Sequence, residues 1–359
     1  MKGRISWRQL RRLQMLIILP TTVVFLPGAA FTAARAGALW AVSLAAALAF
    51  LVNAAVAWAV VGWGPPRLFR DAFGKKVARL ALGTYGMCVM VALISIWNEL
   101  LSFVSASVLP RTPEWAVGAF ILAAVIPLVQ AGPEGLARIS DLLTMTGLLF
   151  SGVLLFSAVA FIRPENYLPW WPQRPLQIVQ GAVMPLSFLG ESVIGVAFLP
   201  YCRPGPPQPL RRAIVEGALW CSGVLLATVA VVWGELGTNY AAHGAYPVLE
   251  AMREVRGGEF FSRLDLIYVP VWLGLIELKL GIWTFVATDA TRRALGLSPR
   301  PWLAFAIGAS TLAAATLGFP TVQSRLHFIV TSWTTSLFPA LVLLFVSAGL
   351  LARRKAAKT

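Results

Sequence analysis

Apolar residues dominate long, nearly uninterrupted stretches of this chain, and polar residues collect between them. Each stretch approaches or exceeds about 20 residues with few charges, the length that a helix needs to cross the hydrocarbon core of a bilayer. The pattern predicts ten such helices, over Gln9–Phe31, Ala38–Gly62, Val77–Val108, Trp115–Ala131, the run after Asp141 that ends near Ile162, Ile178–Leu199, Ala213–Trp233, Leu264–Thr288, Trp302–Phe319 and Phe328–Leu351.

Basic residues lie mostly in the polar segments at one side of these spans. The N-terminal segment, the connection Trp63–Val77 and the tail residues Arg353, Arg354 and Lys355 are all rich in Lys or Arg. Cytoplasmic loops of membrane proteins carry an excess of these residues. We therefore predict a multi-pass protein with both termini in the cytoplasm and residues 352–359 as a cytoplasmic tail.

Ten spans divide into two halves of five, residues 1–162 and 178–351, joined by an interfacial connection at 163–177. An odd number of spans per half makes the second half run inverted relative to the first, as in many secondary transporters. We predict an all-α polytopic membrane protein, a single transmembrane domain over residues 1–359. Its two inverted five-helix repeats would have a LeuT-like arrangement, in which helices 1 and 6 are broken.

Composition supports this class and argues against others. The 359-residue chain is 58% hydrophobic and only 13% charged, so its polar residues could not cover a soluble protein of this size. The net charge of +15 is spread between the apolar runs, so we expect the lipid bilayer and no nucleic acid as a partner. Cysteine and histidine spacing predicts no metal or cofactor, and the absence of a nucleophile–base pair or phosphate loop argues against an enzyme.

The first and sixth apolar stretches each contain helix-breaking residues near their middle. Pro20, Thr21 and Thr22 interrupt the first, with Pro27 and Gly28 following, and the segment from Pro185 to Gly190 interrupts the sixth just before Glu191. A carboxylate at mid-membrane is costly to ionise and marks a functional site by default. Free N–H groups at a break suit a carboxylate and free C=O groups suit an ammonium, which points to an amino-acid-like ligand.

Residues at these two breaks form the candidate ligand-binding site. They are Pro20, Thr21, Thr22, Phe25, Ser187, Phe188, Gly190, Glu191 and Ser192. Two alternatives stay open for their roles. Glu191 is either part of the ligand site or a protonated carboxyl that hydrogen-bonds to a neighbouring helix. Ser187 and Ser192 either donate to the ligand or bond back to their own helix.

Three further ionisable residues are candidates for ion or proton coupling, or for counter-ions. Glu277 and Lys279 are two residues apart, so on a helix they point in nearly opposite directions and cannot pair directly. Lys279 either reaches the cytoplasmic surface or lies buried, where its ammonium replaces a sodium ion or acts as a counter-ion to Glu191 or Glu277. Glu99, which follows Trp97 and Asn98 in the third stretch, is expected in a water-filled vestibule rather than in the core of the site.

Short motifs that carry a family resemblance are distributed over nearly the whole chain. They comprise Ile5–Leu10 before an apolar run ending in Leu26 and Pro27, Ala131–Ser140, Phe188–Glu191, the segment from Tyr246 through Phe260, Arg263 and Asp265, and the region of Lys279. Together they resemble the B subunits of spore germinant receptors, the spore permease branch of the amino acid–polyamine–organocation superfamily. Related permeases usually have a Gly-rich first break, where this chain has Pro20, Thr21 and Thr22.

The resemblance implies a membrane subunit of a germinant receptor in the inner membrane of a bacterial spore, working with a larger A subunit and a lipoprotein C subunit. Such a subunit binds a small, amino-acid-like germinant at the breaks of helices 1 and 6 and signals germination. Two alternatives stay open. One is an autonomous proton-coupled amino-acid or polyamine transporter, and the other is a membrane scaffold with a vestigial pocket.

Overall fold

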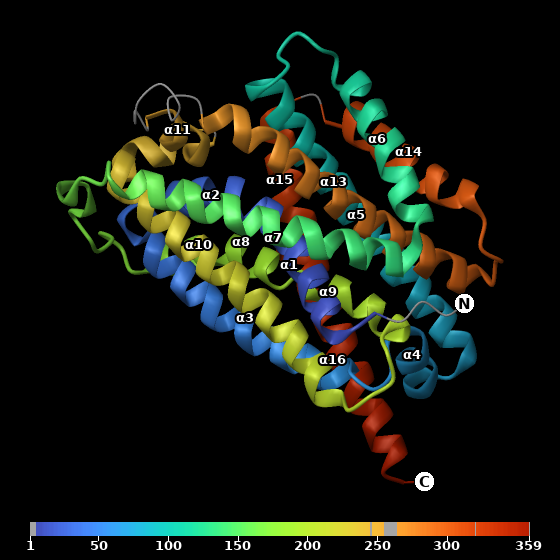
Figure 1. The fold of residues 1–359 in the computed structure, drawn as a ribbon. Helices are drawn as coiled ribbons and strands as arrows, with labels where there is room; N and C mark the ends of the chain where they lie inside the picture. Colours follow the sequence, from blue (N-terminus) through green and yellow to red (C-terminus); the bar gives the residue numbers. More distant parts are fainter. Residues whose placement is uncertain (1–4, 245, 255–263, 320, 359) are drawn as a thin grey trace.

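The regular secondary structure of the described residues is helical (Figure 1). The computed structural model describes residues 5–244, 246–254, 264–319 and 321–358, which contain one isolated β-bridge, between Ile5 and Cys202. The α-helices are α1 (Trp7–Val24), α2 (Leu26–Ala34), α3 (Ala38–Val60), α4 (Pro65–Phe73), α5 (Lys75–Ser107), α6 (Glu114–Gln130), α7 (Gly132–Val159), α8 (Leu176–Leu189), α9 (Ser192–Gly195), α10 (Pro207–His243), α11 (Pro247–Glu254), α13 (Leu264–Leu295), α14 (Pro301–Leu317), α15 (Val322–Phe328) and α16 (Phe338–Ala356). A π-helical segment, Ile329–Leu337, precedes α16.

Seven helical stretches in the described residues are long and apolar enough to cross a membrane. They are Leu26–Val60, Lys75–Ser107, Gly132–Val159, Leu176–Tyr201, Pro207–His243, Tyr268–Leu295 and Gln323–Ala356. Helices α6 and α14 are also apolar but shorter, at 17 residues each. The prediction of an all-α polytopic membrane protein is confirmed at this level.

Helix α1 lies in the middle of the bundle, with α7, α10 and α13 packed against it (Figure 1). Every residue from Leu13 to Val24 is buried, which is the pattern of a core helix rather than a lipid-facing one. Ion pairs fix its first turns to two neighbours: Arg12 reaches Asp141 of α7 at 2.7 Å, and Arg11 reaches Glu216 of α10 at 2.9 Å.

The predicted interruption at Pro20, Thr21 and Thr22 is wrong, because all three lie inside continuous α1. Proline removes one backbone donor but is tolerated where tertiary contacts satisfy the groups around it. Here the Trp272 indole donates to the Pro20 carbonyl at 2.9 Å, and the Thr22 hydroxyl donates to its own helix. Helices α1 and α2 instead meet at Phe25, where Pro27 occupies the first turn of α2.

The sixth predicted span is interrupted next to its carboxylate. Helix α8 ends at Leu189 and the four-residue α9 begins at Ser192, so Gly190 and Glu191 lie between the two helices. A glycine is required there because a Cβ atom at position 190 would overlap the ring of Phe338. The Glu191 backbone is therefore held at a tight turn inside the bundle.

Candidate functional site

Four side chains from four separate parts of the fold form a buried polar chain, which we call the Lys279 cluster. The Lys279 ammonium on α13 donates to Glu191 Oε2 at 2.8 Å and to the Thr21 hydroxyl at 2.7 Å. The Thr21 hydroxyl in turn donates to Glu99 Oε2 on α5, at 3.0 Å. All four side chains are almost completely buried, with Glu99 the most exposed at 3%.

Charge is unbalanced within the Lys279 cluster. The cluster holds one ammonium and two carboxylates. The ammonium pairs with Glu191, and Glu99 Oε1 is buried without a hydrogen-bond partner among the described residues. A buried charge is tolerated when it is paired and hydrogen-bonded, and removing one partner of such a pair typically costs about 3–5 kcal/mol. The cluster can therefore accept one further cationic group, a proton or an ammonium, at Glu99.

The turn that carries Glu191 is held by side chains from other helices. At the end of α8, the Asn53 amide of α3 donates to the Leu189 carbonyl at 3.1 Å. The Tyr85 hydroxyl of α5 lies 3.3 Å from the carbonyl oxygens of both Val193 and Ile194. Carbonyls at a helix end have no partner within their own helix, so these contacts satisfy them where water and lipid cannot.

A cavity of about 650 Å³, here the Glu99 cavity, begins at the Lys279 cluster. Glu99 is the cluster member that lines it, and its neighbour Asn98 lines it too, with both side-chain polar atoms buried and unpartnered among the described residues. Phe25 and Tyr246 contribute aromatic walls, their ring centroids 5.5 Å apart. The volume is typical of small-molecule sites that combine apolar walls with a few convergent polar groups.

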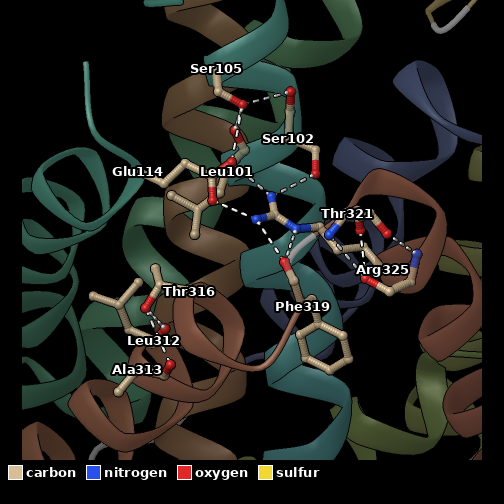
Figure 2. Close-up of polar contacts among 11 residues, drawn as sticks. Leu101, Ser102, Ser105, Glu114, Leu312, Ala313, Thr316, Phe319, Thr321 and Arg325 are labelled. Atoms are coloured by element: carbon tan, nitrogen blue, oxygen red, sulfur yellow. Dashed lines mark hydrogen bonds and ion pairs between the residues drawn. The ribbon is translucent and has the colours of Figure 1, made fainter. Parts of the chain in front are cut away.

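Arg325 of α15 supplies a cation to the wall of the same cavity. Its guanidinium makes two bonds to the Glu114 carboxylate of α6, at 2.9 and 2.6 Å, and one to the Ser102 hydroxyl of α5, at 3.1 Å (Figure 2). A two-bond pair of this kind fixes geometry as well as charge. It ties α15, which precedes the cavity-lining Ile329 and Val330, to α5 and α6.

The predicted site residues are only partly brought together. Glu191, Thr21, Lys279 and Glu99 meet in the cluster, and Phe188 lies beside it, with its ring centroid 5.8 Å from Lys279 Nζ. Ser187 instead bonds to the Met184 carbonyl and the Thr334 hydroxyl, as expected from the alternative that serines bond back to their own helix. The hydroxyl of Ser192 is buried without a partner among the described residues.

Glu277 lies apart from the cluster. Its side chain is half-buried and makes no hydrogen bond or ion pair with the described residues. Of the two counter-ion roles left open for Lys279, the pairing with Glu191 is therefore the one observed. Among the described residues, no three His, Cys, Asp or Glu side chains come together as a metal site requires. Phe260 and Arg263, which belong to the family motifs, lie outside the described residues.

Four residues of the candidate site or its supports were not singled out from the sequence: Asn53, Asn98, Glu114 and Arg325. Asn98 had the clearest available signal, because an amide directly before Glu99 in an apolar stretch is unusual. Glu114 and Arg325 stand in short connections, where single charges are ordinary. Nothing in their local sequence indicates that they meet.

Comparison with known proteins points in one direction. A family model described as "Spore germination protein" matches residues 4–320. The chain is 25% identical over 183 residues to the putative spore germination protein YfkT of Bacillus subtilis (strain 168), covering 50% of this chain and 49% of the relative. It is 26% identical over 198 residues to spore germination protein XB of Bacillus anthracis (54% and 53%), and 23% identical over 300 residues to spore germination protein KB of Bacillus subtilis (strain 168) (81% and 79%). The chain thus spans about half the length of the first two relatives.

Proposed function

This chain belongs to the spore germination protein family, and on that premise we propose that it is a membrane subunit of a germinant receptor. In this proposal the Glu99 cavity binds a small, amino-acid-like germinant, and occupation of the cavity signals germination. The subunit works with an A subunit and a C subunit in the spore inner membrane, and it catalyses no reaction.

One observation carries the binding proposal: buried polar side-chain atoms line the Glu99 cavity without hydrogen-bond partners. Glu99 Oε1 and the amide of Asn98 are in this position among the described residues. A buried polar group without a hydrogen bond costs about 1–3 kcal/mol, which a ligand donor can recover. The ammonium of an amino acid supplies such a donor.

The same proposal includes an architecture. Ten spans form two inverted five-helix repeats, with α1 and the α8–α9 segment as their leading helices and both termini in the cytoplasm. Three features support it: the seven long apolar stretches, the two shorter apolar helices α6 and α14, and the burial of α1 in the bundle centre. The meeting of Thr21 and Glu191 at Lys279 is the contact expected of two leading helices that face each other.

Equilibrium binding tests the germinant site directly. Purified protein in nanodiscs is incubated with a panel of radiolabelled amino acids and simple alkylamines. We expect saturable binding that Glu99→Gln lowers at least tenfold, because an amide replaces the charged acceptor. Glu134→Gln is the matched control, since Glu134 is an exposed carboxylate at the start of α7. Equal binding by the two variants, or none by the wild type across the panel, would overturn the proposal.

A second candidate function is transport coupled to protons. The observation that favours it is the excess carboxylate of the Lys279 cluster, which can take up and release a proton beside the cavity. Liposomes that contain the purified protein distinguish the two functions under an imposed pH gradient. Accumulation of a ligand that binds would favour the transporter, and binding without accumulation would favour the receptor.

A further inference from the structure

A second cavity lies at the other end of α10 from the Glu99 cavity. It has a volume of about 750 Å³ and is formed by the first turns of α10, the last turns of α3 and the start of α1. Arg211 and Arg212 line it together with Gln208 and Trp7. None of these residues belongs to the Lys279 cluster or to the cavity proposed for the germinant.

Positive charge exceeds negative charge in this second cavity. Its one carboxylate, Glu216, is shared by Arg212 at 2.8 Å and Arg11 at 2.9 Å. Arg211 forms no ion pair with the described residues, and its Nε is buried without a hydrogen-bond partner there. The guanidinium of Arg353 from α16 acts on it as a like charge. An unpaired, partly buried guanidinium beside another cation is costly unless an anion joins them.

Apolar side chains form the rest of the wall. Val215 and Leu219 follow Arg211 along α10, and Leu219 is 45% exposed on the outer surface of the bundle. Trp58, near the end of α3, is 43% exposed and stacks with Arg353 at 4.3 Å. Tryptophan and arginine at the ends of spanning helices mark the headgroup level of a bilayer. The cavity therefore has a cationic part at headgroup depth and an apolar part that continues towards the acyl chains.

We infer that Arg211 and Arg212 bind the phosphate of an anionic lipid headgroup, with an acyl chain along Val215 and Leu219. A phosphate oxygen supplies the acceptor that Arg211 Nε lacks and neutralises the repulsion from Arg353. Basic pockets between membrane helices select anionic headgroups in this way. A free phosphate ion offers the same oxygens but leaves the apolar wall uncovered, so the lipid matches more of the cavity.

Lipid binding to the purified full-length protein tests the inference. The detergent-solubilised protein is titrated with short-chain phosphatidylglycerol, and bound lipid is counted by native mass spectrometry. Short-chain phosphatidylcholine is the headgroup control. We expect tighter binding of phosphatidylglycerol, weakened about fivefold by Arg211→Gln and largely retained by Arg211→Lys. Arg300→Gln is the matched control, because Arg300 is exposed before α14 and leaves the cavity intact.

Three results would overturn the inference. Equal affinity for the two lipids would show that no anionic headgroup is selected. An equal loss in Arg211→Gln and Arg300→Gln would show general surface attraction. Displacement of phosphatidylglycerol by inorganic phosphate at low millimolar concentration would assign the site to a free anion. The wild-type comparison of the two lipids does not depend on how any variant folds.

Discussion

Replacing Lys279 by methionine removes the one cation of the Lys279 cluster and keeps a side chain of similar length. Glu191 then loses its ion pair at 2.8 Å, and Thr21 loses the ammonium that fixes its hydroxyl. Two carboxylates remain in the bundle interior without a cation. We expect this variant to be strongly destabilised, and the double variant Lys279→Met/Glu191→Gln to be less so.

The magnitude follows from the geometry and burial of the pair. At 2.8 Å and an effective dielectric constant of about 20, Coulomb attraction is about 6 kcal/mol, which desolvation of both ions partly offsets. Breaking a buried pair by removing one partner typically costs about 3–5 kcal/mol. Lys279→Met should therefore lower the free energy of unfolding by about that amount. The coupling energy between Lys279 and Glu191 should be about 3 kcal/mol.

A double-mutant cycle measures this coupling. The free energy of unfolding is obtained by reversible denaturation with sodium dodecyl sulfate in mixed micelles, for the wild type, both single variants and the double variant. The control cycle uses Arg138 and Glu134, an exposed pair at 2.6 Å whose coupling should be about 1 kcal/mol or less. A Lys279–Glu191 coupling no larger than that of the control would refute the reasoning.

Three further changes test other parts of the site by the same unfolding measurement. Gly190→Ala should lower the free energy of unfolding by about 1–3 kcal/mol, because the new methyl group overlaps the ring of Phe338. Gly223→Ala is the control, because a methyl group there contacts no neighbouring atom. Asn53→Leu should lower the free energy of unfolding by about 1–3 kcal/mol, because it leaves the last carbonyl of α8 without a donor. An unchanged free energy of unfolding would contradict the role of Asn53 in holding the end of α8. Arg325→Lys removes the two-bond geometry with the α6 carboxylate, so it should lower the free energy of unfolding by about 1–3 kcal/mol. An unchanged free energy would contradict the role of this pair in joining α15 to α6.

Much of the helix pattern could be predicted from hydrophobicity alone. Apolar length dictates where a chain can cross lipid, so the expected stretch Ala213–Trp233 lies wholly within α10 (Pro207–His243). The predicted ends of the helices were less accurate, because a helix continues beyond its apolar stretch wherever other contacts stabilise the additional turns. The predicted interruption at Pro20 was wrong for a related reason. Proline removes one backbone donor, but the burial of α1 from Leu13 to Val24 among neighbouring helices keeps the helix continuous.

Within the site, sequence identified the charged groups but not their partners. Glu191, Glu99 and Lys279 were recognisable because an ionisable residue inside an apolar stretch is costly. Which carboxylate Lys279 would meet depends on how helices pack, and Glu277, the nearer one in sequence, is not the partner. Thr21 was chosen as part of an interruption, yet its role is to join Lys279 to Glu99 from within an intact helix.

The position of α1 in the bundle centre also has a consequence for biosynthesis. Thr21 meets Lys279 across 258 residues of sequence, and Glu191 meets Lys279 across 88. Until Lys279 and α13 have been synthesised, the carboxylates of Glu99 and Glu191 have no cation, and α1 lacks the helix α13 that covers one of its sides. Contacts this distant in sequence form late. The buried centre of the protein is therefore complete only once α13 is present, and a chain that ends before α13 leaves Glu99 and Glu191 without the ammonium of Lys279.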